Sequence, residues 1–299
     1  MESTETQWRQ ERISRNVLVM RWEAKSRSEN PSKILLIGDA HWDNPKCDRE
    51  LLQHHLDEAS AINAPVLIGG DFFCAMQGKW DKRANKNDIL PEHQTGSYLD
   101  ALVATAAEWL EPYKSIIRLI CRGNHETAIL SHHETDLTER LVQSLKDRGG
   151  ICEAGGYAGW VKFQLSRGGE GKTKAQACGV FNLHYHHGFG GGGPVTMGKI
   201  DFNRYAMQVE YDILWAQHVH NTEIFDTRMA VLNQSHNVEH KARWHVRTPT
   251  YKEEYQDGFG GFHVEKGRGP RPLGGVWLEF YKMRSNRDRF AILPSRTKE

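Results

Sequence analysis

The chain has 299 residues, of which 38% are hydrophobic and 26% are charged, and its 39 Lys and Arg residues nearly balance its 38 Asp and Glu residues. This composition excludes disordered, collagenous and coiled-coil chains, and a chain of this length can bury roughly three quarters of its unfolded surface without a disulfide or a structural metal. The near-neutral charge argues against a general nucleic-acid coat, although it allows a local basic groove.

The cysteines and the N-terminal residues bear on the compartment of the protein. Five cysteines without a C-x-x-C pair form an odd set that is typical of reduced thiols rather than of a disulfide framework. Residues 1–10 are polar and lack the apolar core of a signal peptide, and no apolar run reaches the ~18 residues of a membrane span. We therefore expect a cytoplasmic protein that has no membrane partner.

Strands and helices are predicted to alternate over the first two thirds of the chain. Short apolar runs that stop at glycine or at polar residues predict strands, and apolar residues at helical spacing predict helices. In chain order, the sequence predicts an edge strand at 16–22, strands at 33–37, 65–68, 115–121, 157–165, 179–185 and 212–216, and helices at 49–62, 96–111, 134–146 and 200–209.

Beyond residue 221 the helical spacing fades. Short β-like runs recur at 223–225, 229–232, 243–247, 275–281 and 290–293. Strands that alternate with helices, followed by strands alone, predict an α/β protein with mixed rather than purely parallel sheets. The expected parts are a polar segment with an edge strand at 1–31, a core at 32–235, and a β-rich extension at 236–299 that belongs to the same domain.

Residue types that bind metals follow five of the predicted strands. In chain order they are Asp39 and His41, then Asp71, then Asn124 and His125, then a group of histidines at 184, 186 and 187, and then His218 and His220. In open α/β sheets, ligands bind in the crevice beyond the carboxyl ends of the strands, so residues at these ends converge although they are distant in sequence. The five groups therefore predict one common site.

The residue types indicate which metals the site would take. Imidazoles mixed with carboxylates and one amide oxygen suit Mn²⁺, Fe²⁺ or Zn²⁺, whereas a calcium site would use oxygens alone and a structural zinc site would use thiolates. About seven ligands are too many for one tetrahedral ion. They suit two ions roughly 3.5 to 4 Å apart, which can share a carboxylate.

Five short motifs contain these residues in a fixed order. They are Gly38-Asp39-Ala40-His41, Gly70-Asp71, Gly123-Asn124-His125-Glu126, His187-Gly188 and His218-Val219-His220. In type and order they resemble the G-D-x-H, G-D, G-N-H-E, His-Gly and G-H-x-H motifs of the calcineurin-like metallophosphoesterases. Any one motif would be a weak match, whereas the ordered set after predicted strands is specific.

The resemblance implies a four-layer sandwich of two mixed β-sheets flanked by helices, with two divalent metal ions. By position, the first ion would be held by Asp39, His41 and His220, the second by Asn124, His187 and His218, and both by the bridging Asp71. The family's non-ligand histidine corresponds to His125, which would contact the phosphate and protonate the leaving oxygen. The nucleophile would be a metal-bound hydroxide, because coordination lowers the pKa of water to about 7.

Two positions depart from the family's pattern. Gln217 stands where the family usually has glycine, and glutamine tolerates fewer backbone conformations in a turn. After Asp71 the chain continues with Phe72-Phe73-Cys74-Ala75 and lacks the Asp and Arg with which Ser/Thr protein phosphatases hold the phosphate. The second departure argues against a protein phosphatase, although Arg122 and the motif after it resemble that branch.

The histidines near residue 185 leave one ligand open. On a strand at 179–185, His184 and His186 point to one face and His187 to the other, so the three cannot all be ligands of one site. Because Gly188 follows it, His187 is the predicted ligand, and His186 is the alternative.

Two features bear on the substrate. Residues 241–299 contain 13 Lys and Arg against 7 Asp and Glu, a surplus that could neutralise nucleic-acid phosphates or form a solvated face. Aromatic residues could stack a base near the metals or belong to the core, and the core is the favoured interpretation. These aromatic residues are Trp42, Tyr251, Tyr255, Phe259 and Phe262.

The sequence thus predicts a metal-dependent phosphoesterase, with a phosphodiesterase as the favoured form and DNA, RNA or a nucleotide as candidate substrates. The alternatives are a phosphomonoesterase acting on a nucleotide or a protein, and a non-catalytic scaffold of the same fold. A scaffold would need neither His125 nor a full ligand set. The sequence points to no particular protein partner.

Overall fold

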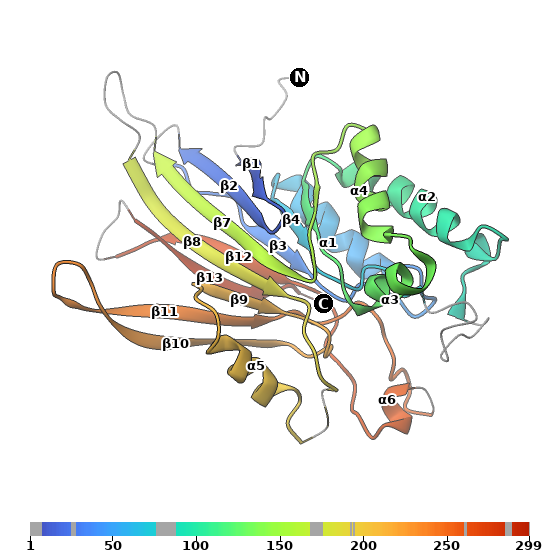
Figure 1. The fold of residues 1–299 in the computed structure, drawn as a ribbon. Coiled ribbons are helices and arrows are strands. Elements are labelled where there is room, and N and C mark those ends of the chain that lie inside the picture. Colours follow the sequence, from blue (N-terminus) through green and yellow to red (C-terminus); the bar gives the residue numbers. More distant parts are fainter. Residues whose placement is uncertain are drawn as a thin grey trace.

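Two β-sheets pack face to face, and helices cover their outer sides (Figure 1). The computed structural model describes residues 8–24, 28–75, 88–167, 176–191, 193, 195–259, 262–284 and 289–298. Within them, none of the helices combines the length and the apolar character that a membrane span requires. The five cysteines are free thiols.

The larger sheet has seven strands and mixes parallel with antiparallel pairs. In spatial order it consists of β1 (Trp8–Ser14), β2 (Val17–Ala24), β7 (Ala158–Arg167), β8 (Gln176–His186), β9 (Ile213–Ala216), β11 (Val238–Arg247) and β10 (Glu223–Leu232). The pairs β2 with β7, β8 with β9 and β9 with β11 are parallel, and the other neighbours are antiparallel.

The smaller sheet has six strands. In spatial order it consists of β13 (Phe290–Arg296), β12 (Val276–Lys282), β3 (Ile34–Ile37), β4 (Val66–Ile68), β5 (Ile117–Ile120) and β6 (Glu153–Ala154). Strands β3 to β6 are parallel, while β12 runs antiparallel to β3 and carries β13 at the edge. The last two strands of the chain therefore complete this sheet rather than form a separate one.

The described residues form six α-helices, most of which cover the outer sides of the sheets. They are α1 (Arg49–Ala61), α2 (Tyr98–Leu110), α3 (Asn124–His133), α4 (Leu137–Asp147), α5 (Lys199–Ala206) and α6 (Phe262–Glu265), with 3-10 turns at Pro91–His93 and Glu111–Tyr113. Buried side chains of α1, α2 and α4 share a core with the six-stranded sheet, and those of α5 pack against β9 of the other sheet. The order helix, sheet, sheet, helix confirms the four-layer α/β sandwich.

Strand β3 explains why the parallel strands appear as continuous apolar runs. Leu35 and Ile37 face the core beneath the helices, whereas Ile34 and Leu36 face the core between the two sheets. Because both faces of the strand are covered, every residue is buried and the apolar pattern does not alternate. A strand of the other sheet, β7, alternates between buried and half-buried residues.

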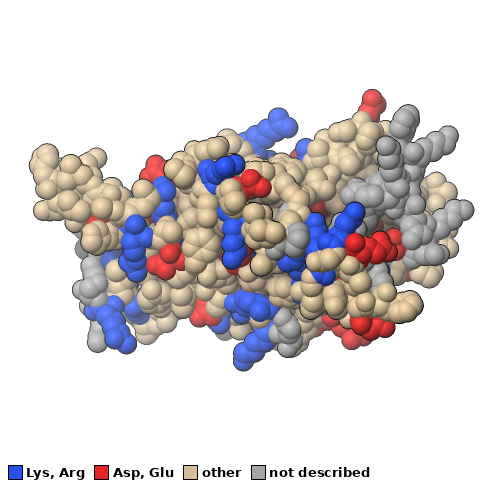
Figure 2. Space-filling model, turned by 90° about the horizontal axis from the view of Figure 1, so that it is seen from below, with Lys and Arg blue, Asp and Glu red and all other residues tan. Residues whose placement is uncertain are grey.

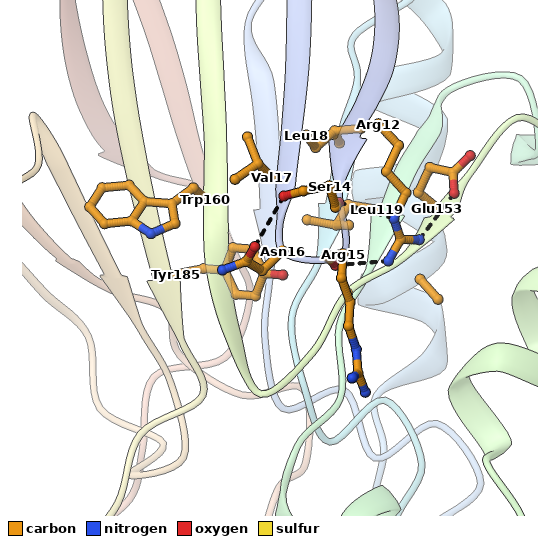
Figure 3. Close-up of a pocket in the computed structure, with 12 residues that line it drawn as sticks. Arg12, Ser14, Arg15, Asn16, Val17, Leu18, Leu119, Glu153, Trp160 and Tyr185 are labelled. Atoms are coloured by element: carbon orange, nitrogen blue, oxygen red, sulfur yellow. Dashed lines mark hydrogen bonds and ion pairs between the residues drawn. The ribbon is translucent and has the colours of Figure 1, made fainter.

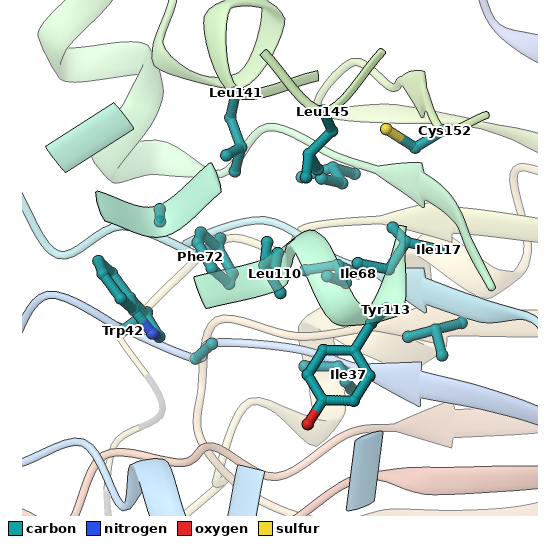
Figure 4. Packing of buried hydrophobic residues seen from close by; sticks show 14 of the residues in the cluster. Ile37, Trp42, Ile68, Phe72, Leu110, Tyr113, Ile117, Leu141, Leu145 and Cys152 are labelled. Carbon is teal, nitrogen blue, oxygen red and sulfur yellow. The ribbon is translucent and has the colours of Figure 1, made fainter. Parts of the chain in front are cut away.

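The helix layer is attached by side chains that repeat at helical spacing. Figure 4 shows Leu110 of α2 and Leu141 and Leu145 of α4 directed toward Ile68 and Ile117 of the sheet. Residues four positions apart lie on the same face of a helix, which is why the two leucines of α4 both reach the core. Burying each such side chain contributes roughly 1.5 to 3 kcal/mol.

Most differences from the predicted elements occur where pairing with a neighbouring strand, rather than the local sequence, determines the extent of an element. The strand predicted at the edge is β2, but β1 pairs outside it, and only Trp8 of β1 is buried. The runs at 223–225 and 229–232 are parts of one strand, β10, because β11 pairs along its whole length. The helices α3 and α6 and the two-residue strand β6 were not predicted.

Two of the aromatic residues considered as stacking platforms belong to the core. Trp42 and Tyr251 are buried, which confirms the favoured interpretation for both. Tyr255 is half-buried and Phe259 is exposed. The side chain of Phe262 lies outside the described residues.

Candidate metal centre

The predicted metal-binding residues lie in loops that follow the C-terminal ends of β3, β4, β5, β8 and β9. Asp39 follows β3, Asp71 follows β4, Asn124 follows β5, His187 follows β8 and His218 follows β9. The first two loops are joined by the backbone, since the N–H of Asp39 donates to Gly70 O (3.2 Å). The topology thus gathers residues that are far apart in sequence.

Several of these loops are held in the left-handed region of the backbone map, where φ is positive. The residues and their φ values are Asp39 at 47°, His41 at 47°, Asp71 at 57°, His218 at 75° and His220 at 58°. Residues other than glycine adopt this region uncommonly and at a cost of roughly 1 to 3 kcal/mol each, and such residues cluster at functional sites.

The first group of converging side chains consists of Asp39, His41 and His220. One ligand atom from each lies within 4.8 Å of the others. Nε2 of His41 is 3.3 Å from Nε2 of His220, which in turn is 3.7 Å from Oδ1 of Asp39. Asp39 and His41 are fully buried, and only 14% of the His220 side chain is exposed.

The second group consists of Asp71, His187 and His218, whose ligand atoms also lie within 4.8 Å of one another, together with Asn124. Oδ1 of Asn124 is 2.9 Å from Nε2 of His187 and 2.8 Å from Nδ1 of His218. Nε2 of His187 is 3.2 Å from Oδ2 of Asp71. Two ring nitrogens and two side-chain oxygens thus lie close together.

The two groups adjoin at Asp71. Its backbone oxygen accepts from the N–H of His41 (3.0 Å), and its Oδ1 accepts from the N–H of His125 (2.9 Å). The ring centroids of His41 and His125 are 5.0 Å apart. A second link runs from the N–H of His218 to Oδ2 of Asp39 (2.8 Å). Asp71 therefore belongs to the second group by its carboxylate and is joined to the loop of the first group by its backbone.

The structure brings His187, not His186, into this cluster. The ring of His187 is 1% exposed and contacts Asp71 and Asn124. The ring of His186 turns away toward Tyr205, with ring centroids 4.5 Å apart, and His184 accepts or donates a hydrogen bond with the hydroxyl of Tyr205 at 2.7 Å.

The electrostatics of the cluster favour a cation. Burial, with a further contribution from Asp71, raises the pKa of Asp39 to about 8. Burial lowers the pKa of His220 to about 3 and that of His41 well below its usual range. At His187 burial alone lowers the pKa, but the Asp71 carboxylate outweighs it and raises the pKa to about 9. The lowered pKa values keep His41 and His220 neutral, and neutral imidazoles beside a buried carboxylate are a donor set that divalent first-row metals take.

Unsatisfied polar atoms lead to the same conclusion. Oδ1 of Asp39 and Nδ1 of His41 are buried and have no hydrogen-bond partner among the described residues. Leaving such groups unpaired costs roughly 1 to 3 kcal/mol each, and more for a charged group. A divalent cation at Asp39 would remove the cost at the carboxylate, so the residues present fit a metal.

A family model describes most of this chain. The model of the calcineurin-like phosphoesterases matches residues 32–259, which include every residue of the two groups. The chain belongs to this family. A comparison with curated protein sequences finds no match.

Three solved structures are similar to this calcineurin-like phosphoesterase. Vacuolar Protein Sorting 29 from Cryptosporidium parvum is 13% identical, with 90% of this chain and 98% of that chain covered and a TM-score of 0.37. Wild-type Vps29 complexed with Zn²⁺ from Entamoeba histolytica is 12% identical, with 89% and 99% covered and a TM-score of 0.37. A metallophosphoesterase from Sphaerobacter thermophilus is 11% identical, with 89% of each chain covered and a TM-score of 0.33.

One carboxylate that the motif analysis left without a role stabilises the loops of the candidate metal centre. Oε2 of Glu126 accepts from the backbone N–H groups of Asp71 (3.0 Å) and Gly123 (2.8 Å), and Oε1 accepts from that of Phe73 (2.9 Å). Glu126 therefore ties the loop after β4 to the start of α3. The sequence contained Glu126 in the G-N-H-E motif, but only the fold reveals what it binds.

A second set of hydrogen bonds positions His125. The carboxylate of Asp43 accepts from the N–H of Ala75 (2.9 Å) and from that of Cys74, which holds the loop that follows Asp71. The carbonyl oxygen of Cys74 then accepts from Nδ1 of His125. This contact leaves Nε2 of His125 facing Asp71, at 3.7 Å from its Oδ2.

Gln217 fits its turn because glycines surround its side chain. A Cβ atom built on Gly69 would lie 2.2 Å from Nε2 of Gln217, and one on Gly38 would lie 2.9 Å from its Cγ. Oε1 of Gln217 accepts from the N–H of Gly70 at 2.7 Å and lies 3.3 Å from Nδ1 of His187. The substitution of the family's glycine therefore adds a contact to His187 rather than only straining the turn.

Arg122 does not act as the protein phosphatase resemblance suggested. Its guanidinium forms an ion pair with Asp136, the residue that caps the N-terminus of α4. Arg122 is also not among the residues that line the pocket over the metal-binding groups. It therefore links α3 to α4.

The pocket above the two groups is large enough for a substrate. It has a volume of about 490 Å³, and its walls come from the five loops and from the segment after β11. A second pocket, between the turn of β1 and β2 and strand β6, measures only about 10 Å³, room for about one water. Figure 3 shows Arg12 of this second pocket directed at Glu153 and Arg15 pointing away from both.

The charged side chains on one face of the molecule are mixed. In Figure 2, Lys and Arg side chains stand in separate groups with Asp and Glu between them. The Lys and Arg side chains drawn on this face form no continuous basic track. This matches a solvated face more closely than a groove along a nucleic acid.

Proposed function

We propose that this protein is a phosphoesterase with two divalent metal ions, and that it cleaves phosphodiesters. The observation that carries the proposal is the convergence of two ligand groups that adjoin at Asp71. In this proposal the first ion is held by Asp39, His41 and His220, the second by Asn124, His187 and His218, and both by Asp71. Mn²⁺, Fe²⁺ and Zn²⁺ all suit this donor set.

The residues around the ions divide the remaining work. When bound, two such ions lower the pKa of water and neutralise the charge of a phosphoryl group. His125 is held by the carbonyl of Cys74 through Nδ1, so its Nε2 faces Asp71 and the pocket. We propose that Nε2 of His125 donates a proton to the leaving oxygen, which is the role of a general acid.

Two features favour a diester over a terminal monoester. A monoester presents a dianion, for which Ser/Thr protein phosphatases of this family provide an Asp and an Arg after the second motif. Residues 72–75 provide neither, and Arg122 forms an ion pair with Asp136. A diester carries a single charge and a second ester group, and a pocket of about 490 Å³ accommodates both.

Metal analysis combined with two model substrates tests the proposal. We expect two divalent ions per chain and a higher kcat/KM for bis-p-nitrophenyl phosphate than for p-nitrophenyl phosphate. Faster turnover of the monoester would establish a phosphomonoesterase instead. Full metal occupancy without turnover of either compound would point to the scaffold alternative.

The natural substrate requires a wider panel. Nucleic acid and nucleotides are the proposed class, so the panel contains single-stranded DNA, duplex DNA, RNA and cyclic nucleotides, with phosphopeptides as the contrasting class. Preference for phosphopeptides would contradict the proposed class while leaving the reaction type intact.

A further inference from the structure

The proposed function does not specify which positively charged side chain would bind the substrate phosphate. The arginine with which Ser/Thr protein phosphatases hold the phosphate after the second motif is missing, so a different cation must approach the substrate phosphate if the metals are not to bind it alone. Among the residues that line the pocket, one lysine is buried next to the first metal group. This residue is Lys252.

The backbone around Lys252 is fastened to the loop that carries Asp39. The hydroxyl of Thr250 and the N–H of Tyr251 both donate to Asp39 O, at 2.7 and 3.2 Å. One residue after Lys252, the N–H of Glu253 donates to Lys46 O at 2.9 Å. These contacts fix the lysine relative to the candidate ligands of the first ion.

The ammonium group of Lys252 lies at the edge of the catalytic cluster. Its Nζ is 3.9 Å from Sγ of Cys74, and that sulfur lies within 4.8 Å of a ring nitrogen of both His41 and His125. Cys74 therefore separates the lysine from the proposed general acid. Both side chains line the same pocket.

A carboxylate keeps the buried ammonium charged. Nζ of Lys252 is 2.8 Å from Oε1 of Glu254, and the two side chains are only 7% and 9% exposed. Although burial by itself lowers the pKa of Lys252, its neighbours outweigh that effect and raise the pKa above its usual value. A buried charge is costly unless it is paired, so this lysine is retained in the charged form at a wall where an anion would bind.

We propose that Lys252 binds a non-bridging oxygen of the substrate phosphate and that Glu254 positions it. This inference rests on the proposed function, because it places the scissile phosphate between the metal groups and the lysine. It also explains how the chain can dispense with an arginine after Asp71.

A simpler role must be separated from this one. Glu254 also lies 3.2 Å from Nε2 of His263 and 3.8 Å from Nδ1 of His220, so Lys252 could serve only as the counter-ion of Glu254. In that case Lys252→Met and Glu254→Gln would have the same effect, since each breaks the same ion pair. If Lys252 binds phosphate, the two substitutions differ, because Glu254→Gln retains the lysine side chain and an oxygen that can accept from its Nζ.

The decisive measurement is the affinity of the metal-loaded protein for inorganic phosphate, by isothermal titration, with metal content determined for each variant. We expect Lys252→Met to weaken phosphate binding about 10-fold to 100-fold, the loss of one charge-assisted hydrogen bond, with two ions still bound. Lys252→Arg should restore most of the affinity, and Glu254→Gln should weaken phosphate binding less than Lys252→Met does, since an amide oxygen can still accept from Nζ of Lys252.

A matched control is available at a distant ion pair. Lys33 pairs with Glu279 at 2.7 Å, just before β3 and therefore at the opposite end of that strand from the metal groups. Lys33→Met removes the same charge and should leave phosphate affinity unchanged.

Several outcomes would overturn the inference. They are unchanged phosphate affinity in Lys252→Met, equal losses in Lys252→Met and Glu254→Gln, loss of metal from Lys252→Met, and no phosphate binding by the metal-loaded wild type. The proposed function fails separately, if the wild type binds phosphate through Lys252 but turns over no phosphoester.

Discussion

Nδ1 of His187 lies 3.3 Å from Oε1 of Gln217, a side chain that occupies a position where related motifs have glycine. The same Oε1 accepts from the N–H of Gly70 at 2.7 Å, so the glutamine oxygen is held in place from the other side. Gln217 can therefore accept the Nδ1 proton, which is the arrangement of a histidine that binds a metal through Nε2. Nε2 is the atom that faces Asp71 and Asn124.

The first prediction concerns this contact. Gln217→Met preserves the length of the side chain but removes the acceptor, so we expect the second metal ion to bind about 10-fold to 100-fold more weakly, as is usual when the partner of a ligand histidine is lost. The first ion should bind as before. Titration of the metal-free protein with Zn²⁺ resolves the two events.

Gln217→Glu is the matched control, since it retains an oxygen acceptor at the same distance. It should keep the affinity of the second site close to that of the wild type. Equal weakening of both sites in Gln217→Met would indicate a general disturbance of the turn instead.

His125→Ala should abolish most hydrolysis without releasing metal. The ring contacts Asp71 and the Cys74 carbonyl but belongs to neither ligand group as proposed, and loss of a general acid costs roughly 10²- to 10⁴-fold in kcat. Steady-state turnover of bis-p-nitrophenyl phosphate and metal analysis check the two halves of this prediction. His133→Ala, an exposed residue on the same helix, serves as the control and should behave as wild type. Metal loss in His125→Ala would refute the non-ligand role.

Asp71→Ala and Asp39→Ala should differ in the number of metal ions that remain bound per chain. Asp71 is the proposed bridging ligand, so its removal is expected to release or disorder both ions, whereas Asp39→Ala should release only the first. Elemental analysis after dialysis against a weak chelator measures the number of ions per chain. Full activity and two ions in Asp71→Ala would end the bridging proposal.

Acid should destabilise the folded protein through His184. This ring is buried against Tyr205, and burial lowers its pKa to about 4 from an ordinary 6.5. Between these pH values the unfolded chain binds a proton that the folded chain does not, so the free energy of unfolding decreases as the pH falls from 6.5 toward 4. Burial also lowers the pKa of His186 to about 4, so it contributes in the same direction.

Denaturant unfolding of the metal-free protein at several pH values measures this slope. His184→Gln should make the decrease shallower, while His54→Gln, at an exposed histidine, should leave it as in the wild type. An unchanged slope in His184→Gln would contradict this prediction, because it would show that His184 takes up no proton on unfolding in this pH range.

Local sequence determined the strands and the nature of the site. Runs such as Ile34–Ile37 are apolar throughout because both faces of their sheet are covered. A buried strand of this kind can therefore be recognised from adjacent residues alone. The metal-binding residue types stand directly after such runs, and their order along the chain was enough to indicate the family and the fold. The helix α3, which starts at Asn124, was not predicted, because the apolar spacing that marks helices such as α4 is weak there.

Only the tertiary structure decided which groups meet. Gln217 and His187 are thirty residues apart, and Glu126 and Asp71 are fifty-five apart, so no local pattern relates them. Gly188 had indicated His187 as the ligand, and the fold turns the ring of His187 toward Asp71 and that of His186 toward Tyr205. The place of Lys252 depended on the pairing of its segment with the Asp39 loop. Short-range preferences are encoded by neighbours in the chain, whereas contacts between distant loops exist only once the two sheets have packed.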